Sequence, residues 1–299
     1  MILITSANGN QGKRLIPKLL GAGHHVRACV RTEGSARRLR EEGVQEVLVG
    51  DLADTAFIAK AVHGVESLYH IGPTLHEAER EMGFAMIDAA RSAGVGHFVF
   101  SSVLHAITTD LIQHEIKRDL EEHLLSSGMA FTILQPANYM LPHRLKPVFE
   151  ENVFRLSWSL ARYQSMVDLD DVTDVVALVL ANAQLHAAAT YELAGPGRFT
   201  GHDIGRVLSA VLGRDIRVER IDSEAFLRAR MGDADPQALA YQLRMIRAIE
   251  KRYSNHDFIG NPNVLTWLLG RPPTTFEAFV RKEAAEHMKS TEANQCISR

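Results

Sequence analysis

Three small residues, each separated by two others, follow the first apolar run of the chain. Ser6, Gly9 and Gly12 in the stretch ITSANGNQG (residues 4–12) stand where a dinucleotide-binding loop of the G-x-x-G-x-x-G type has its glycines. Such glycines allow a tight turn, a close approach of the backbone to a pyrophosphate, and close packing of the following helix. The spacing therefore predicts a phosphate-binding loop, with an ordinary polar turn between strand and helix as the alternative. The other predicted contacts of this loop are Asn8, Asn10 and Gln11.

Two residues at this site bear on whether the loop binds a cofactor and on which cofactor it binds. Ser6 is tolerated in place of glycine unless the turn requires a positive φ, which glycine adopts without strain. Arg31 ends the second predicted strand, at the offset where NAD-binding units carry an acidic residue and where an arginine accommodates a ribose 2′-phosphate. Arg31 therefore predicts NADP(H) in preference to NAD(H). The alternative is that Arg31 is a solvated strand end next to Glu33.

Apolar runs and helical repeats alternate through the first half of the chain, and these elements must position the loop. Strands are predicted at 1–5, 25–30, 44–51, 66–72, 97–102 and 129–136. Helices are predicted between them at 11–22, 35–42, 54–63, 78–93 and 114–128. Six strands separated by helices predict an α/β fold of the Rossmann type, a doubly wound parallel sheet whose ligand lies at the carboxyl ends of the strands.

The rhythm of strand and helix breaks after Pro136, which predicts a second, smaller unit. We assign 1–142 with 166–195 to the dinucleotide-binding domain, and 143–165 with 196–286 to a small, mostly helical C-terminal lobe. The polar residues 287–299 are predicted to be disordered. A predicted helix at 168–183 starts with four carboxylates that suit capping better than a carboxylate site, namely Asp168, Asp170, Asp171 and Asp174.

Composition disfavours several classes of function. The net charge is −3 and Lys and Arg do not cluster, which argues against direct binding to nucleic acid. No apolar run approaches the roughly 20 residues that span a membrane, and the start MILIT lacks the basic segment of a signal peptide. Two cysteines, Cys29 and Cys296, favour a reducing, cytoplasmic compartment. Neither their spacing nor that of the histidines predicts a metal site.

Seven stretches carry further information when they are taken together. They are TSANGNQG (5–12), VR (30–31), GDLAD (50–54), FSSVLH (100–105), SGMAFTILQPANYM (127–140), TYELAGPG (190–197) and GNPNVLTWLLGRPPTTFEAF (260–279). Together they resemble the NmrA-like family, an atypical branch of the short-chain dehydrogenases/reductases, over about residues 2–286. The resemblance implies a Rossmann domain that binds NADP(H) beneath a substrate lobe, and it adds Asp51 and Leu52 to the expected cofactor contacts. Ser6 departs from the family pattern.

The resemblance directs attention to the predicted helix at 114–128. The better-known short-chain reductases carry Tyr-x-x-x-Lys here: the tyrosine donates a proton, and the lysine lowers its pKa and holds the nicotinamide ribose. In this chain Lys117 matches the lysine, but Gln113 stands at the tyrosine position, and an amide is no general acid at neutral pH. His114, one helical turn before Lys117, is a candidate proton donor. Tyr139 and His105 are the alternative donors.

Lys117 and His114 also have a purely structural interpretation. Lys117 would then pair with Glu121 on the helix surface, and His114 would lie near the start of the helix. Other candidate cofactor contacts follow the predicted strand ends, where the ligand of a doubly wound sheet lies. These are Gly72, Pro73, Ser101, Ser102, Pro136 and Asn138.

Three functions remain open at this point. The first is an NADPH-dependent oxidoreductase that transfers hydride to a small apolar, aromatic or quinone-like substrate. The second is a non-catalytic regulator of the NmrA type, which senses the redox state of NADP(H) and binds a protein partner; the missing tyrosine favours it. The third is an enzyme that uses the same fold for non-redox chemistry. We favour the enzyme because Lys117 is retained and the second lobe is long enough to cover a pocket.

Overall fold

A seven-stranded parallel sheet forms the centre of the protein. The computed structural model describes residues 1–74, 76–231 and 236–297. The strands run in the order β10-β6-β5-β4-β1-β2-β3, and every neighbouring pair is parallel. Their bounds are β1 (Ile2–Ile4), β2 (Val26–Val30), β3 (Glu46–Val49), β4 (Ser67–His70), β5 (His97–Ser101), β6 (Phe131–Pro136) and β10 (Ala189–Leu193). The predicted doubly wound sheet is confirmed, and the strand expected at 190–195 is its seventh member.

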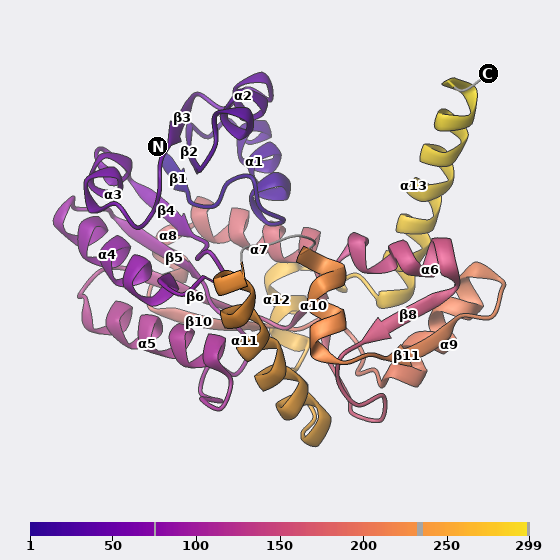
Figure 1. The fold of residues 1–299 in the computed structure, drawn as a ribbon. Coiled ribbons are helices and arrows are strands. Elements are labelled where there is room, and N and C mark those ends of the chain that lie inside the picture. Colours follow the sequence, from indigo (N-terminus) through magenta and orange to yellow (C-terminus); the bar gives the residue numbers. More distant parts are fainter. Residues whose placement is uncertain (75, 232–235, 298–299) are drawn as a thin grey trace.

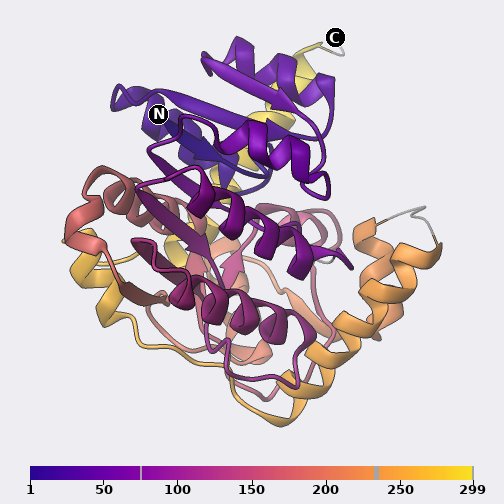
Figure 2. The same ribbon diagram turned by 90° about the vertical axis from the view of Figure 1, so that its left-hand side faces the viewer.

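Helices cover both faces of this sheet (Figures 1 and 2). On one face lie α1 (Gly12–Gly21), α2 (Glu33–Glu41) and α7 (Leu169–Ala181), and on the other lie α3 (Thr55–Val62), α4 (Glu79–Ser92) and α5 (Ile112–Ser126). The alternation of side chains along each strand creates the two cores. In β1, Ile2 and Ile4 point into the core beneath α1 and α7, whereas Leu3 points into the core beneath α3, α4 and α5.

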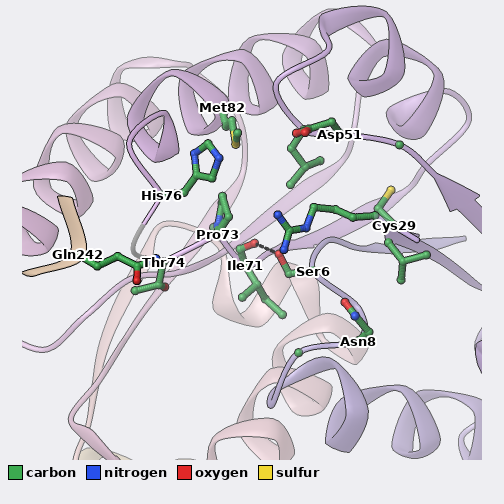
Figure 3. A pocket seen from close by; sticks show the side chains of 16 residues that line it. Ser6, Asn8, Cys29, Asp51, Ile71, Pro73, Thr74, His76, Met82 and Gln242 are labelled. Carbon is green, nitrogen blue, oxygen red and sulfur yellow. Dashed lines mark hydrogen bonds between the residues drawn. The ribbon is translucent and has the colours of Figure 1, made fainter. Parts of the chain in front are cut away.

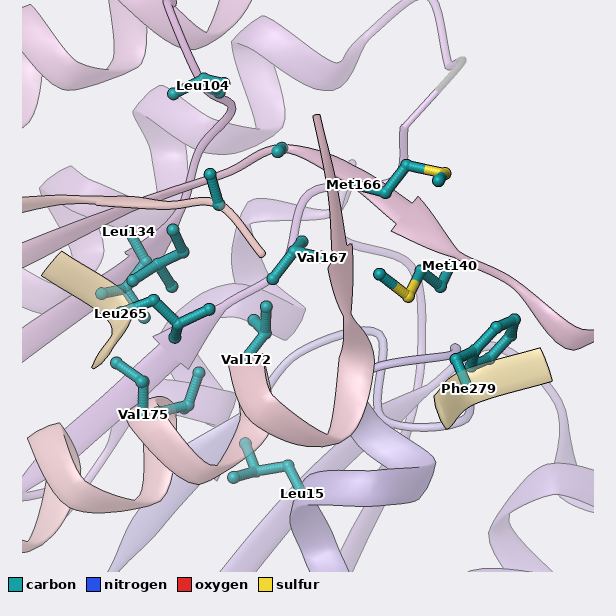
Figure 4. Packing of buried hydrophobic residues seen from close by; sticks show 14 of the residues in the cluster. Leu15, Leu104, Leu134, Met140, Met166, Val167, Val172, Val175, Leu265 and Phe279 are labelled. Atoms are coloured by element: carbon teal, nitrogen blue, oxygen red, sulfur yellow. The ribbon is translucent and has the colours of Figure 1, made fainter. Parts of the chain in front are cut away.

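The core beneath α1 and α7 also anchors the C-terminal part of the chain. Leu15 of α1, Val172 and Val175 of α7 and Leu265 are fully buried in it, and Phe279 lies at its border (Figure 4). Helical spacing places these α7 residues on one face of their helix. Contact with segments near both ends of the chain ties the two halves of the sequence together.

The carboxylates at the start of α7 have structural partners. Asp168 is the N-cap residue, and its Oδ1 accepts a hydrogen bond of 2.7 Å from the backbone N–H of Asp170. Ion pairs join Lys282 to Asp170 at 2.7 Å and Arg271 to Asp171 at 2.7 Å. The expectation that this cluster serves capping is therefore confirmed for Asp168.

Most of the remaining elements lie toward the carboxyl end of the sheet and extend away from it (Figure 1). Two short parallel pairs, β7 (Asn138–Met140) with β9 (Met166–Asp168) and β8 (Val153–Leu156) with β11 (Arg217–Arg220), were not expected from the sequence. The helical segments are η1 (Pro142–Leu145), α6 (Lys146–Glu151), α8 (Ala183–His186), α9 (Gly201–Leu212), α10 (Ser223–Met231), α11 (Pro236–Asn255), α12 (Asn263–Leu269) and α13 (Phe276–Ile297). The mostly helical character expected for the C-terminal lobe is confirmed in the described residues, and the proposed division into two units stays a prediction.

The expected disorder of the C-terminal tail stays a prediction, and the structure describes residues 287–297 as helical. These residues continue α13, which begins at Phe276 and projects from the body of the protein (Figure 1). Phe276 and Phe279 are buried and anchor the first turns, and the following segment is rich in Ala, Glu and Lys, which propagate a helix once it has started. Residues 298–299 lie outside the described part of the chain. Within the described part, no helix combines the length and the apolar character needed to cross a membrane.

Candidate cofactor site

The loop between β1 and α1 adopts a conformation that requires its small residues. Ser6 has a φ of 48°, and its Oγ donates a hydrogen bond of 2.9 Å to the carbonyl oxygen of Ile71. A Cβ atom on Gly9 would stand 3.0 Å from the carbonyl oxygen of Ser6, and one on Gly12 would stand 2.2 Å from that of Ala7. The second glycine thus keeps the loop open, and the third lets α1 pack against the end of β1.

Ser6 occupies the left-handed region that favours glycine, so the loop carries strain there. Ser6→Ala is expected to destabilise the protein by about 1 kcal/mol because it loses the hydrogen bond to Ile71 and keeps the strained φ. Ser6→Gly loses the same bond but relieves the strain, so its free energy of unfolding is expected to lie within about 0.5 kcal/mol of the wild type. Urea unfolding of both variants measures the difference, and equal losses would show that the φ carries no strain.

A cavity of about 430 Å³ opens at the carboxyl ends of β1, β2, β3 and β4, directly above this loop. Figure 3 shows Asn8 and Cys29 near one end of it and Thr74 and Gln242 near the other. Among the predicted cofactor contacts, eight line it: Ser6, Asn8, Gly9, Arg31, Asp51, Leu52, Gly72 and Pro73. The structure thus brings together residues from four separate strand ends.

The residues around the cavity fit a dinucleotide phosphate. The side chain of Gln11, the N-cap residue of α1, does not cap the helix, and the N–H groups of Lys13 and Arg14 donate hydrogen bonds to the backbone carbonyl oxygens of Gly9 and Gln11. At the β2 end, Arg31 is exposed and lines the cavity. Asn8 Nδ2 donates a hydrogen bond of 3.0 Å to Ser35 Oγ, which joins the loop to the start of α2. The glycine loop that leads into α1 and a guanidinium therefore border the same space.

Lys117 lies in the interior and is paired with a residue that sequence reasoning missed. Its Nζ lies 2.7 Å from Glu79 Oε1, and the two side chains are 7% and 0% exposed. The same ammonium lies 5.1 Å from the centre of the Phe100 ring. The surface pair with Glu121 is therefore wrong: Glu121 instead accepts a hydrogen bond of 2.8 Å from Gln135 and another from Ser102.

His114 is fully buried, and its surroundings keep it neutral. Its Nδ1 lies 3.0 Å from the carbonyl oxygen of His105, so Nδ1 carries the proton and Nε2 bears the lone pair. Burial lowers the pKa of His114 to about 4. Burial, together with the nearby Lys117 cation, lowers the pKa of His70 to about 3. At neutral pH, His114 therefore stays neutral, and its Nε2 can accept a hydrogen bond but has no proton to donate.

Stability is expected to fall as the pH is lowered, with His114 contributing about 2 kcal/mol of the loss between pH 7.5 and pH 5. In the unfolded chain His114 binds a proton near its usual pKa of 6.5, whereas the folded protein resists protonation until about pH 4. Acid therefore favours the unfolded state, and stability rises with pH across this window. Urea titrations at several pH values measure this slope. His114→Gln should show a shallower slope, and identical slopes would contradict the assignment.

Tyr139 lies in a polar network on the opposite face of the sheet from Lys117. Burial raises the pKa of Tyr139 above its usual value, and a hydrogen bond with Ser101 acts in the opposite direction. Ser101 Oγ also accepts a hydrogen bond of 3.0 Å from Gln11 Nε2, and Gln11 Oε1 accepts one from Tyr69. Tyr139 packs against the core beneath α1 and α7, whereas Lys117 lies over Phe100 in the other core. The tertiary structure therefore does not rebuild a Tyr–Lys couple from these two residues.

Several predicted contacts are engaged within the protein. Asn138 Nδ2 donates a hydrogen bond of 2.8 Å to Gln164 Oε1. The Pro136 carbonyl accepts a hydrogen bond from the N–H of Leu104. Asn10 and Gln11 lie at the turn into α1, where Gln11 is its N-cap residue. The roles of these residues toward a cofactor stay predictions.

Sequence reasoning missed residues that reach the cavity from outside the loop. His76 follows β4, Met82 comes from α4, and Gln242 comes from α11 in the C-terminal half. Cys29 also lines the cavity as a buried free thiol whose pKa is raised to about 12 by burial. The position of His76 shortly after a strand is a usable signal. Nothing in the local sequence distinguishes Met82 or Gln242 from other residues on their helices.

Comparisons with known proteins agree with this geometry. A model of the NmrA-like family matches residues 1–261. The chain is 30% identical over 291 residues to an NAD(P)H azoreductase of Xenophilus azovorans, covering 95% of this chain and 98% of that protein. An NADPH-dependent quinone oxidoreductase of Escherichia coli, crystallised with NADPH, aligns with a TM-score of 0.77 at 25% identity, over 96% of this chain and 100% of that one.

A third relative has the same fold. NmrA, a negative transcriptional regulator crystallised with NADP, aligns with a TM-score of 0.75 over 95% of this chain and 97% of that one. At 17% identity, this likeness concerns the fold alone. Since the family model extends over most of the chain, this protein belongs to the NmrA-like family.

Proposed function

We propose that this protein is an NADPH-dependent oxidoreductase that reduces a small apolar substrate of aromatic or quinone-like character. The observation that carries the proposal is the cavity at the strand ends, which is bordered by the glycine loop at Ser6, Asn8 and Gly9 and by Arg31. The azoreductase and quinone oxidoreductase relatives support a reductase over their full lengths. When bound, the cofactor supplies the hydride.

The residues around the cavity have separate tasks in this proposal. The open loop at Gly9, which leads to the positive end of the α1 dipole, holds the pyrophosphate. Arg31 binds the 2′-phosphate, which favours NADP(H) over NAD(H). Asp51 and Leu52 at the end of β3 border the adenine side, and Gly72 and Pro73 border the nicotinamide side.

The candidate proton donors are poorly suited to protonating a substrate, and this has a consequence for the kind of substrate that fits the site. The geometry at His114 leaves a lone pair at Nε2, and Tyr139 lacks the neighbouring lysine that would lower its pKa. Of the two, Tyr139 still carries a proton at neutral pH and is the better candidate donor. A substrate whose reduced anion is stable without immediate protonation, such as a quinone, suits this site.

The test is NADPH oxidation followed at 340 nm with a panel of quinones, azo dyes and enones. NADPH should reduce at least one compound at a rate above that of the blank. Tyr139→Phe should lower that rate by about 10²-fold if Tyr139 is the donor, whereas His114→Gln should leave it within a few-fold. A protein that binds NADPH tightly but reduces nothing in the panel would overturn the reductase proposal.

A second candidate is a regulator that binds NADP(H) without catalysis. The observation in its favour is the absence of the Tyr–Lys couple, with Gln113 at the tyrosine position and Tyr139 on the other face of the sheet. The regulator would show unequal affinities for NADP⁺ and NADPH together with no turnover. It would also bind a protein partner in one cofactor state more tightly than in the other.

A further inference from the structure

Glu79 and Lys117 form a buried ion pair beside the cofactor cavity. Their distance is 2.7 Å, and the carboxylate is fully shielded from solvent. Among the described residues, Glu79 Oε2 has no hydrogen-bond partner. Burying two charges with a single contact between them costs free energy, because the loss of hydration exceeds the attraction gained from that contact. A pair of this kind directly beside a cavity is a candidate for function.

Gly72 places the pair directly behind the cavity wall. Gly72 itself lines the cavity. A Cβ atom on Gly72 would stand 2.7 Å from Glu79 Oε1 and 3.1 Å from Lys117 Nζ, so nothing but the glycine backbone separates the pair from this part of the wall. His70, whose ring stacks on Phe100 at 6.0 Å, closes the interior side of the cluster.

The strand order indicates which half of a dinucleotide this wall faces. Arg31 follows β2, the glycine loop follows β1, and Gly72 follows β4, and these strands are consecutive in the sheet. A 2′-phosphate at Arg31 and a pyrophosphate at the loop leave the β4 side for the nicotinamide half. This placement rests on the proposed function.

We propose that Glu79 is a positioning residue that holds and neutralises Lys117 beside the nicotinamide, so that the site tolerates the positively charged ring of NADP⁺. The oxidised ring carries a positive charge and the reduced ring is neutral. With Glu79 in place, the ion pair has no net charge. Without it, a buried ammonium repels the oxidised cofactor and leaves the reduced one unaffected, because charges interact strongly in a poorly screened interior.

The experiment measures dissociation constants for NADP⁺ and NADPH by calorimetry in wild type, Glu79→Gln and Glu79→Gln/Lys117→Met. Glu79→Gln is expected to weaken NADP⁺ binding about tenfold more than NADPH binding. The double variant, which contains neither charge, is expected to return the ratio of the two constants to within about threefold of the wild type. Circular dichroism and thermal unfolding establish that each variant is folded.

A control variant and a graded variant keep the result interpretable. Glu46→Gln also removes a carboxylate from an ion pair, with Arg27 at 2.7 Å, but Glu46 does not line the cavity, so the ratio should not change. If Glu79→Gln does not fold, Glu79→Asp decides. Its shorter side chain holds the carboxylate farther from Lys117, so it compensates the ammonium less completely. The ratio of the NADP⁺ and NADPH dissociation constants should then shift in the same direction by about threefold.

The outcomes separate this inference from the proposed function. A wild type that binds neither cofactor would refute the proposed function. A wild type that binds both, with an unchanged ratio in folded Glu79→Gln, would refute the role of Glu79 alone. Equal weakening of both cofactors, without recovery in the double variant, would assign Glu79 a structural role and equally overturn the proposal.

Discussion

Gly9→Val is expected to abolish NADPH binding, with an increase in Kd of more than about 100-fold. Gly9 lines the cavity, and a Cβ atom there would stand 3.0 Å from the backbone oxygen of Ser6. The two further methyl groups of valine have to point into the space where the pyrophosphate approaches the loop. The backbone of the loop lines this site, so no neighbouring side chain can rotate away to make room for the pyrophosphate.

Calorimetric titration with NADPH measures this effect. Gly21→Val is a matched control, because Gly21 lies in α1, and a Cβ atom there has no neighbour within 4 Å. The control should bind NADPH within about twofold of the wild type. Tight NADPH binding by a folded Gly9→Val protein would show that the phosphates lie elsewhere.

Arg31→Glu is expected to weaken NADPH binding by about 10²-fold while leaving NADH binding within a few-fold of the wild type. The variant loses a charge-assisted contact with the 2′-phosphate, worth roughly 1.5–3 kcal/mol or about 10- to 100-fold in affinity. The introduced carboxylate also repels the phosphate. NADH has no 2′-phosphate, so neither change acts on it.

Titrating both cofactors into wild type and variant gives the preference directly. Arg40→Glu makes the same change in net charge on the adjoining helix α2, where Arg40 pairs with the exposed Glu33. It should reduce NADPH affinity far less than Arg31→Glu does. Equal affinities of the wild type for NADPH and NADH would contradict the role of Arg31.

Local patterns in the sequence were sufficient for the framework of the cofactor site. The alternation of apolar runs with helical repeats predicted the six strands and five helices of the first half, because each element buries its own face against the sheet. The spacing of Ser6, Gly9 and Gly12 predicted the loop, and Arg31 was expected at a strand end. Parallel strands bring their carboxyl ends to one edge, so these distant residues were bound to meet there.

The conformation of Ser6 and the protonation of His114 were decided by the tertiary structure. A serine in this loop is compatible with either sign of φ, and the hydrogen bond to Ile71, 65 residues away, accompanies the strained one. His114 looks like a proton donor on a helical wheel. It becomes a neutral acceptor because the fold buries it against the carbonyl of His105.

The environment of Lys117 is the clearest case of a feature that local sequence patterns did not predict. Within its own helix, Glu121 is the partner that the i, i+4 spacing suggests. The fold instead packs the start of α4 against α5, which delivers Glu79 from 38 residues earlier in the chain to 2.7 Å from the ammonium. Composition and periodicity determine which faces are buried, because hydrophobic burial depends on local pattern. Which polar groups are buried together depends on long-range packing between elements, and only the tertiary structure determines that.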